Sequence, residues 1–183
     1  MKQYLKALPV FLIIVFVSAP LLRSQTPREL PLWPEGIPEN PVAYTQEKVR
    51  SVEVNESSPS QLNRVFSQVS EPTYVLYRAN KDVAKGVALV ICPGGGFRDV
   101  WFDREGSDFA LWLAEKGITS LVLKYRTYNS DAENFNLSRT QYNGEVYVDA
   151  LQAIHTLRSQ SGELGIDKSK IGIAGYSAGG ALA

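Results

Sequence analysis

The stretch Ile171–Ala183, IGIAGYSAGGALA, decides the fold of this chain. It begins as an apolar, strand-like run, turns sharply around Ser177 and continues as the start of a helix. Gly175 and Gly179 flank the serine in the pattern Gly-x-Ser-x-Gly, and these positions crowd together in so tight a turn that a Cβ atom would clash. In this strand–turn–helix context the pattern predicts a nucleophile elbow that presents Ser177.

A second glycine-rich loop, CPGGGF at 92–97, follows another apolar run. Its glycines let the backbone approach a ligand closely and turn N–H groups toward it. In enzymes with a nucleophile elbow, a loop at this position donates hydrogen bonds to an oxyanion, and Pro93 stands here where a histidine is often found. We therefore predict that the oxyanion hole is formed by the backbone N–H groups of Gly95, Gly96 and Ala178.

Each loop alone is a weak signal, because small residues are also common in turns without a ligand. The sequence disfavours a phosphate-binding loop, since no Gly-Lys-Ser/Thr follows either glycine cluster, and the dinucleotide pattern Gly-x-Gly-x-x-Gly is absent at both places. Two glycine-rich loops in the right order, each after an apolar strand, favour the serine nucleophile.

The rest of the chain predicts an α/β fold with a mostly parallel sheet and helices on both faces. Strands buried on both faces are expected from the apolar runs at 86–92, 118–125 and 170–175. Helices are expected at 104–117 and 146–160, and antiparallel strands within 47–54 and 64–79.

The second helix is expected to bury Val148, Leu151, Ile154 and Leu157. The polar stretch 126–144 before it is expected to be a loop on the ligand-binding side of the sheet. Three aromatic residues of this loop either stack on a ring of the ligand or pack within the loop: Tyr128, Phe135 and Tyr142.

The N-terminus predicts an export signal over 1–24, since two lysines precede a short apolar run and small residues follow it. The run is shorter than the roughly 20 residues that cross a bilayer, although an uncleaved anchor is the alternative. Residues 25–48 are proline-rich and extended, with Trp33 anchoring them to the domain at 49–183. The signal implies a secreted or periplasmic protein.

The amino-acid composition limits the classes of binding partner that are expected. Lys+Arg and Asp+Glu number 19 each, so no strong electrostatic attraction to nucleic acid or an anionic surface is expected. Cys92 is the one cysteine, which excludes an intrachain disulfide, and its apolar surroundings indicate a packing residue. No metal or organic cofactor is implied.

The chain resembles α/β-hydrolase fold serine esterases of the acetyl-xylan and feruloyl esterase-like kind, which are related to hormone-sensitive-lipase-type carboxylesterases. The likeness covers nearly everything after the signal, and its motifs are LWPEGIPENP, ALVICPGGGF, EGSDFALWLAEKGI, LVLKYR, VDALQAIHTLRS and LGIDKSKIGIAGYSAGGALA. The resemblance implies that Ser177 is the nucleophile and that the substrate is an acetyl or similar ester of a polysaccharide or oligosaccharide. Asp149 matches a recurrent acidic position, expected to be structural and at a helix start.

A serine nucleophile needs a histidine base and an acid, and in this fold both follow the serine along the chain. The one histidine, His155, precedes Ser177 and is interpreted as a partly exposed helix residue. We therefore expect an N-terminal fragment of a longer enzyme, truncated after the elbow and inactive alone. The alternatives are a prolyl-oligopeptidase-like serine peptidase and a non-catalytic binding protein with the same fold.

Overall fold

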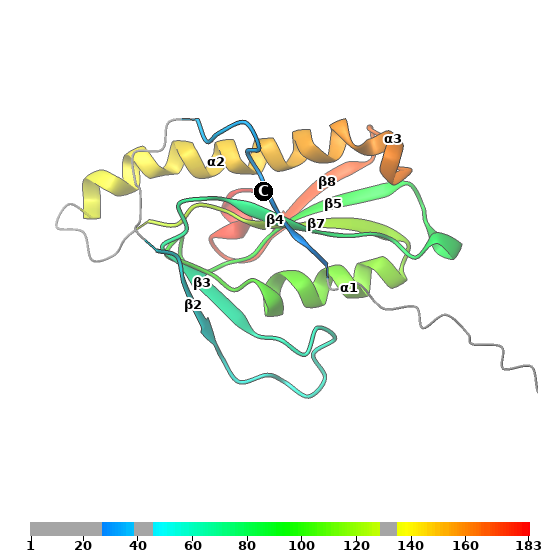
Figure 1. Cartoon of the computed structure of the whole chain (residues 1–183), viewed down its shortest axis with the longest axis horizontal. Coiled ribbons are helices and arrows are strands. Elements are labelled where there is room, and N and C mark those ends of the chain that lie inside the picture. The colour runs from blue at the N-terminus through cyan, green and yellow to red at the C-terminus, as the bar shows by residue number, and fades with distance from the viewer. Residues whose placement is uncertain (1–26, 39–45, 129–134) are drawn as a thin grey trace, which may run out of the picture.

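The computed structural model describes residues 27–38, 46–128 and 135–183, and in the helix that begins at 135 it describes side chains from 144 onward. A central sheet lies between helices α1 and α2, which cover its opposite faces (Figure 1). The predicted export signal at 1–24 falls outside the described residues, as do the side chains of Phe135 and Tyr142.

The central sheet has five strands in the order β1-β4-β7-β5-β8. Their bounds are β1 Glu29–Pro31, β4 Thr73–Tyr77, β7 Ile118–Lys124, β5 Val87–Cys92 and β8 Ile171–Gly175. β7, β5 and β8 are parallel, whereas β4 is antiparallel to its neighbours β1 and β7. Four of the five described strands thus share one direction, which confirms the predicted sheet.

A second sheet contains three short antiparallel strands, β2 Lys48–Ser51, β3 Arg64–Ser67 and β6 Asp99–Val100, in that order. The antiparallel strands expected at 47–54 and 64–79 are confirmed, although the second segment divides between the two sheets as β3 and β4. The proline-rich segment also contributes a strand, β1, to the central sheet, although the sequence indicates only extended backbone there.

The helices are α1 Asp108–Glu115, α2 Phe135–Ser159 and α3 Ser161–Leu164. Three short helical turns complete the list: η1 Lys81–Val83, the π-turn η2 Asp103–Ser107, and η3 Gly179–Ala181. α1 ends where predicted, because Gly117 adopts a φ of +81° and a Cβ atom there would lie 1.9 Å from the carbonyl oxygen of Val83.

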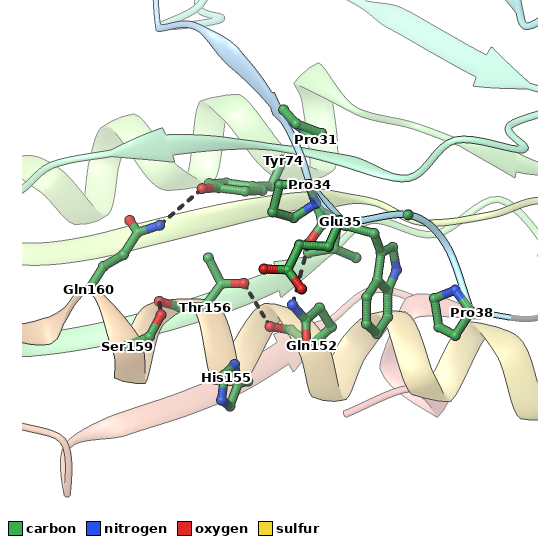
Figure 2. A pocket seen from close by; sticks show the side chains of 13 residues that line it. Pro31, Pro34, Glu35, Pro38, Tyr74, Gln152, His155, Thr156, Ser159 and Gln160 are labelled. Atoms are coloured by element: carbon green, nitrogen blue, oxygen red, sulfur yellow. Dashed lines mark hydrogen bonds between the residues drawn. The ribbon is translucent and has the colours of Figure 1, made fainter.

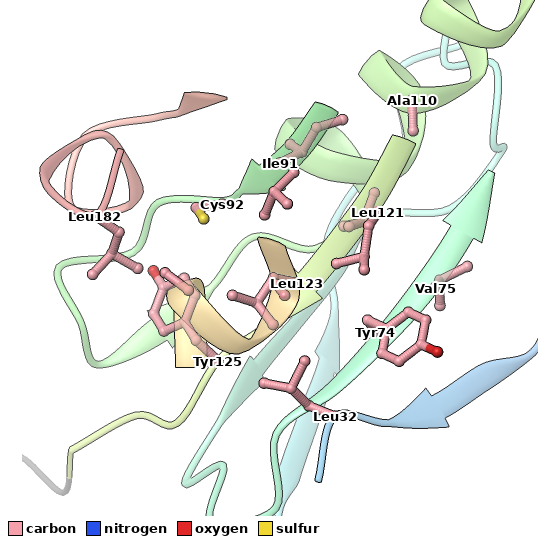
Figure 3. Packing of buried hydrophobic residues seen from close by; sticks show 14 of the residues in the cluster. Leu32, Tyr74, Val75, Ile91, Cys92, Ala110, Leu121, Leu123, Tyr125 and Leu182 are labelled. Atoms are coloured by element: carbon pink, nitrogen blue, oxygen red, sulfur yellow. The ribbon is translucent and has the colours of Figure 1, made fainter. Parts of the chain in front are cut away.

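The buried strands β5 and β7 explain the long apolar runs. Val90 pairs with Leu121 in parallel register, and neither residue is exposed to solvent. Along β7 and just past its end, Leu121, Leu123 and Tyr125 share one face because side chains alternate with a period of two (Figure 3). The core therefore forms on both faces of the central strands.

The expectation that β8 is buried on both faces is wrong for the described residues. Its residues are half-buried or exposed, because β8 pairs with β5 and stands at the edge of the described sheet. An apolar run reveals a strand, but the place of that strand in the sheet depends on the folded topology.

Helix α2 differs from its prediction at both its start and its buried face. It begins at Phe135, inside the stretch 126–144 expected to be a loop. Leu151 is 65% exposed and Val148 39%, so these two residues do not face the core as predicted. Leu157 is fully buried and Ile154 packs against the core, as predicted, and the buried face also contains Val146, Asp149, Ala150 and Ala153. Small alanines allow the helix to lie close to the sheet, a packing effect that hydropathy spacing alone underrates.

The proline-rich segment is anchored by Trp33, as predicted. Its indole Nε1 donates a hydrogen bond of 3.0 Å to Asp149 Oδ1. Asp149 is fully buried and also accepts hydrogen bonds from the guanidinium of Arg126, at 2.9 Å from both Nε and Nη2. The structural role expected of Asp149 is confirmed, but its place is well inside α2 and not at a helix start.

Candidate active site

The turn that follows β8 is strained in the way the sequence predicts. Ser177 adopts a φ of +50°, in the left-handed region that residues other than glycine rarely enter. A Cβ atom at Gly175 would lie 2.1 Å from the carbonyl oxygen of Gly179, so the two flanking glycines do crowd each other. Such strain at a polar residue is characteristic of functional sites.

The turn rests on the end of β5. The N–H of Tyr176 donates to the carbonyl oxygen of Cys92 over 3.1 Å. A Cβ atom at Gly179 would lie 2.0 Å from the same oxygen, so a larger residue does not fit there. The turn η3 follows directly, and within the described part of the chain no hydrogen bond is formed by the N–H of Ala178.

The glycine-rich loop that follows β5 has a backbone that only glycine adopts easily. Gly95 and Gly96 have φ values of +139° and +64°. A Cβ atom at Gly95 would lie 2.0 Å from the carbonyl oxygen of Asp99, whereas Gly96 has open space around it. Among the described residues, neither of their N–H groups has a hydrogen-bond acceptor. They are therefore free to bind a ligand atom.

Buried and half-buried side chains hold this loop in place. The buried hydroxyl of Tyr125 donates to the carbonyl oxygen of Pro93 over 2.7 Å. The N–H of Gly94 donates to Glu105 Oε2 over 2.8 Å and is not available to a substrate. The N–H of Tyr128 donates to the carbonyl oxygen of Phe97 over 3.1 Å. Neither Glu105 nor Tyr125 was found by sequence reasoning, although Glu105 begins the quoted motif EGSDFALWLAEKGI.

The structure brings this loop and Ser177 together. A Cβ atom at Gly94 would lie 2.6 Å from the carbonyl oxygen of Tyr176 and 3.2 Å from Ser177 Cβ. The two glycine-rich loops are thus in van der Waals contact at the carboxyl ends of two adjacent parallel strands, β5 and β8. Ligands bind at this end of open α/β sheets.

His155 lies elsewhere. It is exposed on α2 and lines a cleft of about 610 Å³ with residues such as Pro34, Tyr74 and Gln160 (Figure 2). This cleft borders β1 and β4, at the far edge of the sheet from β8. The chain beyond α2 leads to the amino end of β8, whereas Ser177 follows its carboxyl end. The structure therefore does not place His155 beside Ser177.

Burial decides the role of the cysteine. Cys92 is fully buried, and burial raises the pKa of its thiol to about 12, so it is a packing residue.

Within the described ranges, no group of three or more His, Cys, Asp or Glu side chains could hold a metal ion. Among the described helices, none is long and apolar enough to span a bilayer.

Comparison with known proteins gives consistent likenesses. No protein-family profile matches the chain. An acetylxylan esterase of Xylanibacter ruminicola is 33% identical over 97 residues, which are 53% of this chain and 18% of that protein. An acetyl ester-xyloside bifunctional hydrolase from Caldicellulosiruptor lactoaceticus has a similar structure, with a TM-score of 0.54 and 27% identity over 87% of this chain and 47% of that one. The chain thus spans less than half the length of either protein.

Proposed function

Because the chain has an α/β-hydrolase fold and resembles an acetylxylan esterase over half of its length, we propose that it carries the nucleophile and the oxyanion hole of a serine carboxylesterase. The proposed substrates are acetyl or similar esters of a polysaccharide or oligosaccharide. One observation carries the proposal: Ser177, in a left-handed turn, lies against a glycine-rich loop that has free N–H groups. Such a pair of loops is the geometry that acyl transfer requires.

In the proposed reaction, Ser177 Oγ attacks the ester carbonyl carbon and its proton passes to a general base. The carbonyl oxygen, on which negative charge develops, accepts hydrogen bonds from the N–H groups of Gly95, Gly96 and Ala178. Collapse of the tetrahedral intermediate breaks the ester C–O bond, the sugar oxygen takes the proton from the base and leaves as a hydroxyl, and an acyl-serine remains. Water then attacks the acyl-serine and releases the acid. Each oxyanion donor contributes about 10²–10³ in turnover.

The proposed reaction needs a histidine as its general base, and the described structure does not place a histidine beside Ser177. His155 lines a separate cleft beside β1 and β4, at the far edge of the sheet from β8. We infer that the histidine and its acid partner are supplied by residues other than these 183, a view that the 18% and 47% coverage of the two relatives supports. The described chain would then have little turnover alone.

In this proposal, the loop after β7 lies on the side of the site that binds the substrate. Tyr128 follows that strand, bonds to Phe97 in the glycine-rich loop and is packed against the core. This packing supports the view that Tyr128 shapes the loop, whereas stacking on a sugar ring needs an exposed aromatic face.

The test uses the complete gene product that contains this chain. We expect it to hydrolyse p-nitrophenyl acetate and to release acetate from acetylated xylan, and we expect Ser177→Ala to reduce both rates at least 10³-fold. The matched control is Ser57→Ala, since Ser57 is exposed and distant from the elbow in sequence. Turnover by the Ser177→Ala variant equal to that of the parent protein would refute the proposal.

The two alternative functions predict different outcomes in the same assays. A prolyl-oligopeptidase-like enzyme would cleave peptide anilides faster than acyl esters in a matched panel. A binding protein with this fold would turn over neither class. Export is proposed from the signal at 1–24, and N-terminal sequencing of the mature protein tests it, with a start near residue 25 expected.

A further inference from the structure

The half-buried carboxylate of Glu105 binds the loop that lies against Ser177. The N–H of Gly94 donates to Glu105 Oε2 over 2.8 Å. A Cβ atom at Gly94 would lie 2.9 Å from that same oxygen and 3.2 Å from Ser177 Cβ. Glu105 and Ser177 therefore flank one glycine, and the carboxylate is part of the immediate surroundings of the site.

Glu105 stands on a rigid and irregular turn. It belongs to the π-turn η2, in which the N–H of Ser107 donates to the carbonyl oxygen of Phe102 over 3.0 Å. The fully buried Asp103 fixes this turn, because its carboxylate accepts hydrogen bonds from Arg64 Nε at 2.8 Å and from Ser107 Oγ at 3.1 Å. Such π-turns occur frequently at functional sites.

The residue after Glu105 presses the turn against both the sheet and the loop. A Cβ atom at Gly106 would lie 2.5 Å from Val122 Cγ1 and 3.2 Å from Pro93 Cγ. Gly106 thus permits a close approach that a larger residue would prevent. The backbone of Glu105 is consequently fixed relative to β7 and to the start of the glycine-rich loop.

The loop itself depends on contacts of this kind. A run of three glycines has no side chains to hold it, and its conformational freedom is large. Gly94 is held on both sides, because its carbonyl oxygen accepts a hydrogen bond of 3.0 Å from the N–H of Trp101 while its N–H is bound by Glu105. The orientation of Gly94 fixes where the next two N–H groups point.

We propose that Glu105 is a positioning residue that holds Gly94 so that the N–H groups of Gly95 and Gly96 stay directed at the reacting carbonyl oxygen. This inference rests on the proposed esterase function. The role requires an acceptor oxygen at the reach of a glutamate side chain, and it does not require the negative charge, which would oppose an oxyanion nearby. Preorganised donors stabilise a transition state without reorganisation.

Two conservative variants separate acceptor from charge. Glu105→Gln keeps an oxygen at the same reach and removes the charge, whereas Glu105→Asp keeps the charge and withdraws the carboxylate by about 1.5 Å, beyond hydrogen-bond distance of Gly94. In the complete gene product acting on p-nitrophenyl acetate, we expect Glu105→Gln to retain kcat within about threefold. We expect Glu105→Asp to lower kcat about tenfold or more, with KM unchanged within about twofold.

The matched controls are Glu115→Gln and Glu115→Asp, because Glu115 is an exposed residue at the end of α1. Both should leave kcat and KM unchanged. Impairment of Glu105→Gln with a fully active Glu105→Asp would overturn the proposal in favour of a charge effect. Equal activity of both Glu105 variants and the parent enzyme would also overturn it. If the parent enzyme itself shows no Ser177-dependent turnover, the proposed function has failed instead.

Discussion

Gly179 lies so close to Cys92 that a Cβ atom added to the glycine would be 2.0 Å from the cysteine carbonyl oxygen. The elbow therefore packs directly against the end of β5. The hydrogen bond from the N–H of Tyr176 to the same oxygen fixes the position of the elbow relative to β5. This contact also sets the distance between Ser177 and the glycine-rich loop that leaves β5. The geometry of the candidate site is thus built into the pairing of two strands.

The first prediction concerns that contact. Gly179→Ala should force the elbow away from β5, lower the free energy of unfolding by about 1–3 kcal/mol and reduce esterase kcat by about tenfold or more. Chemical denaturation and p-nitrophenyl acetate turnover measure the two effects. Gly144→Ala is the control, because a Cβ atom there has nothing within 4 Å and should be neutral or slightly stabilising. Full activity in Gly179→Ala would contradict the described packing.

A second prediction tests the strain at Ser177. A left-handed backbone costs an L-residue about 1–2 kcal/mol that glycine does not incur. Ser177→Gly should therefore have a free energy of unfolding about 1 kcal/mol higher than Ser177→Ala, although both variants should be inactive. The two variants lack the same hydroxyl group and thus control for each other. Equal unfolding free energies would mean that the turn is not strained in solution.

A third prediction concerns the buried group formed by Trp33, Asp149 and Arg126. Asp149→Leu removes the fully buried carboxylate that accepts hydrogen bonds from Arg126 Nε and Nη2, although Glu145 Oε2 still lies 3.7 Å from Arg126 Nη1, and it should lower the free energy of unfolding by about 3 kcal/mol. Trp33→Phe removes one hydrogen bond from the same carboxylate and should cost about 1 kcal/mol. Urea titrations of the complete gene product measure both. A smaller effect of Asp149→Leu than of Trp33→Phe would contradict this arrangement.

The fourth prediction follows from the raised pKa of Cys92, which burial brings to about 12. At pH 8 the thiolate fraction in the folded protein should be about 10⁻⁴, compared with about a quarter for an unperturbed thiol. A disulfide reagent such as Ellman's reagent should therefore react at least about 100-fold more slowly with the folded protein than with the denatured protein. Comparable rates would show that Cys92 is accessible.

Much of the fold was predictable from local sequence because its strongest signals are local. The apolar runs of β5 and β7, the stop at Gly117 and the strained turn at Ser177 each depend on a few adjacent residues. The errors concern long-range packing: the burial of β8 depends on which strands lie beside it, and the buried face of α2 depends on the close packing of Ala150 and Ala153.

In the candidate site, too, the local features were predictable from the sequence and the long-range contacts were not. Its glycines could be identified from two short motifs, and the structure places both motifs in contact at Gly94. Glu105 could not be recognised as their partner, because its hydrogen bond depends on how the π-turn packs against β7 and Pro93. A carboxylate at the start of a helix is common in sequences, and its role here depends on the residues that contact it in the folded chain.

The most direct test of the account is covalent labelling of Ser177 in the complete gene product with a fluorophosphonate, followed by peptide mass spectrometry. The account predicts one adduct per chain, located on the peptide that contains Ser177, and absent from the Ser177→Ala variant. An adduct on a different residue, or an active esterase that the probe leaves unlabelled, would contradict the assignment of Ser177 as the nucleophile.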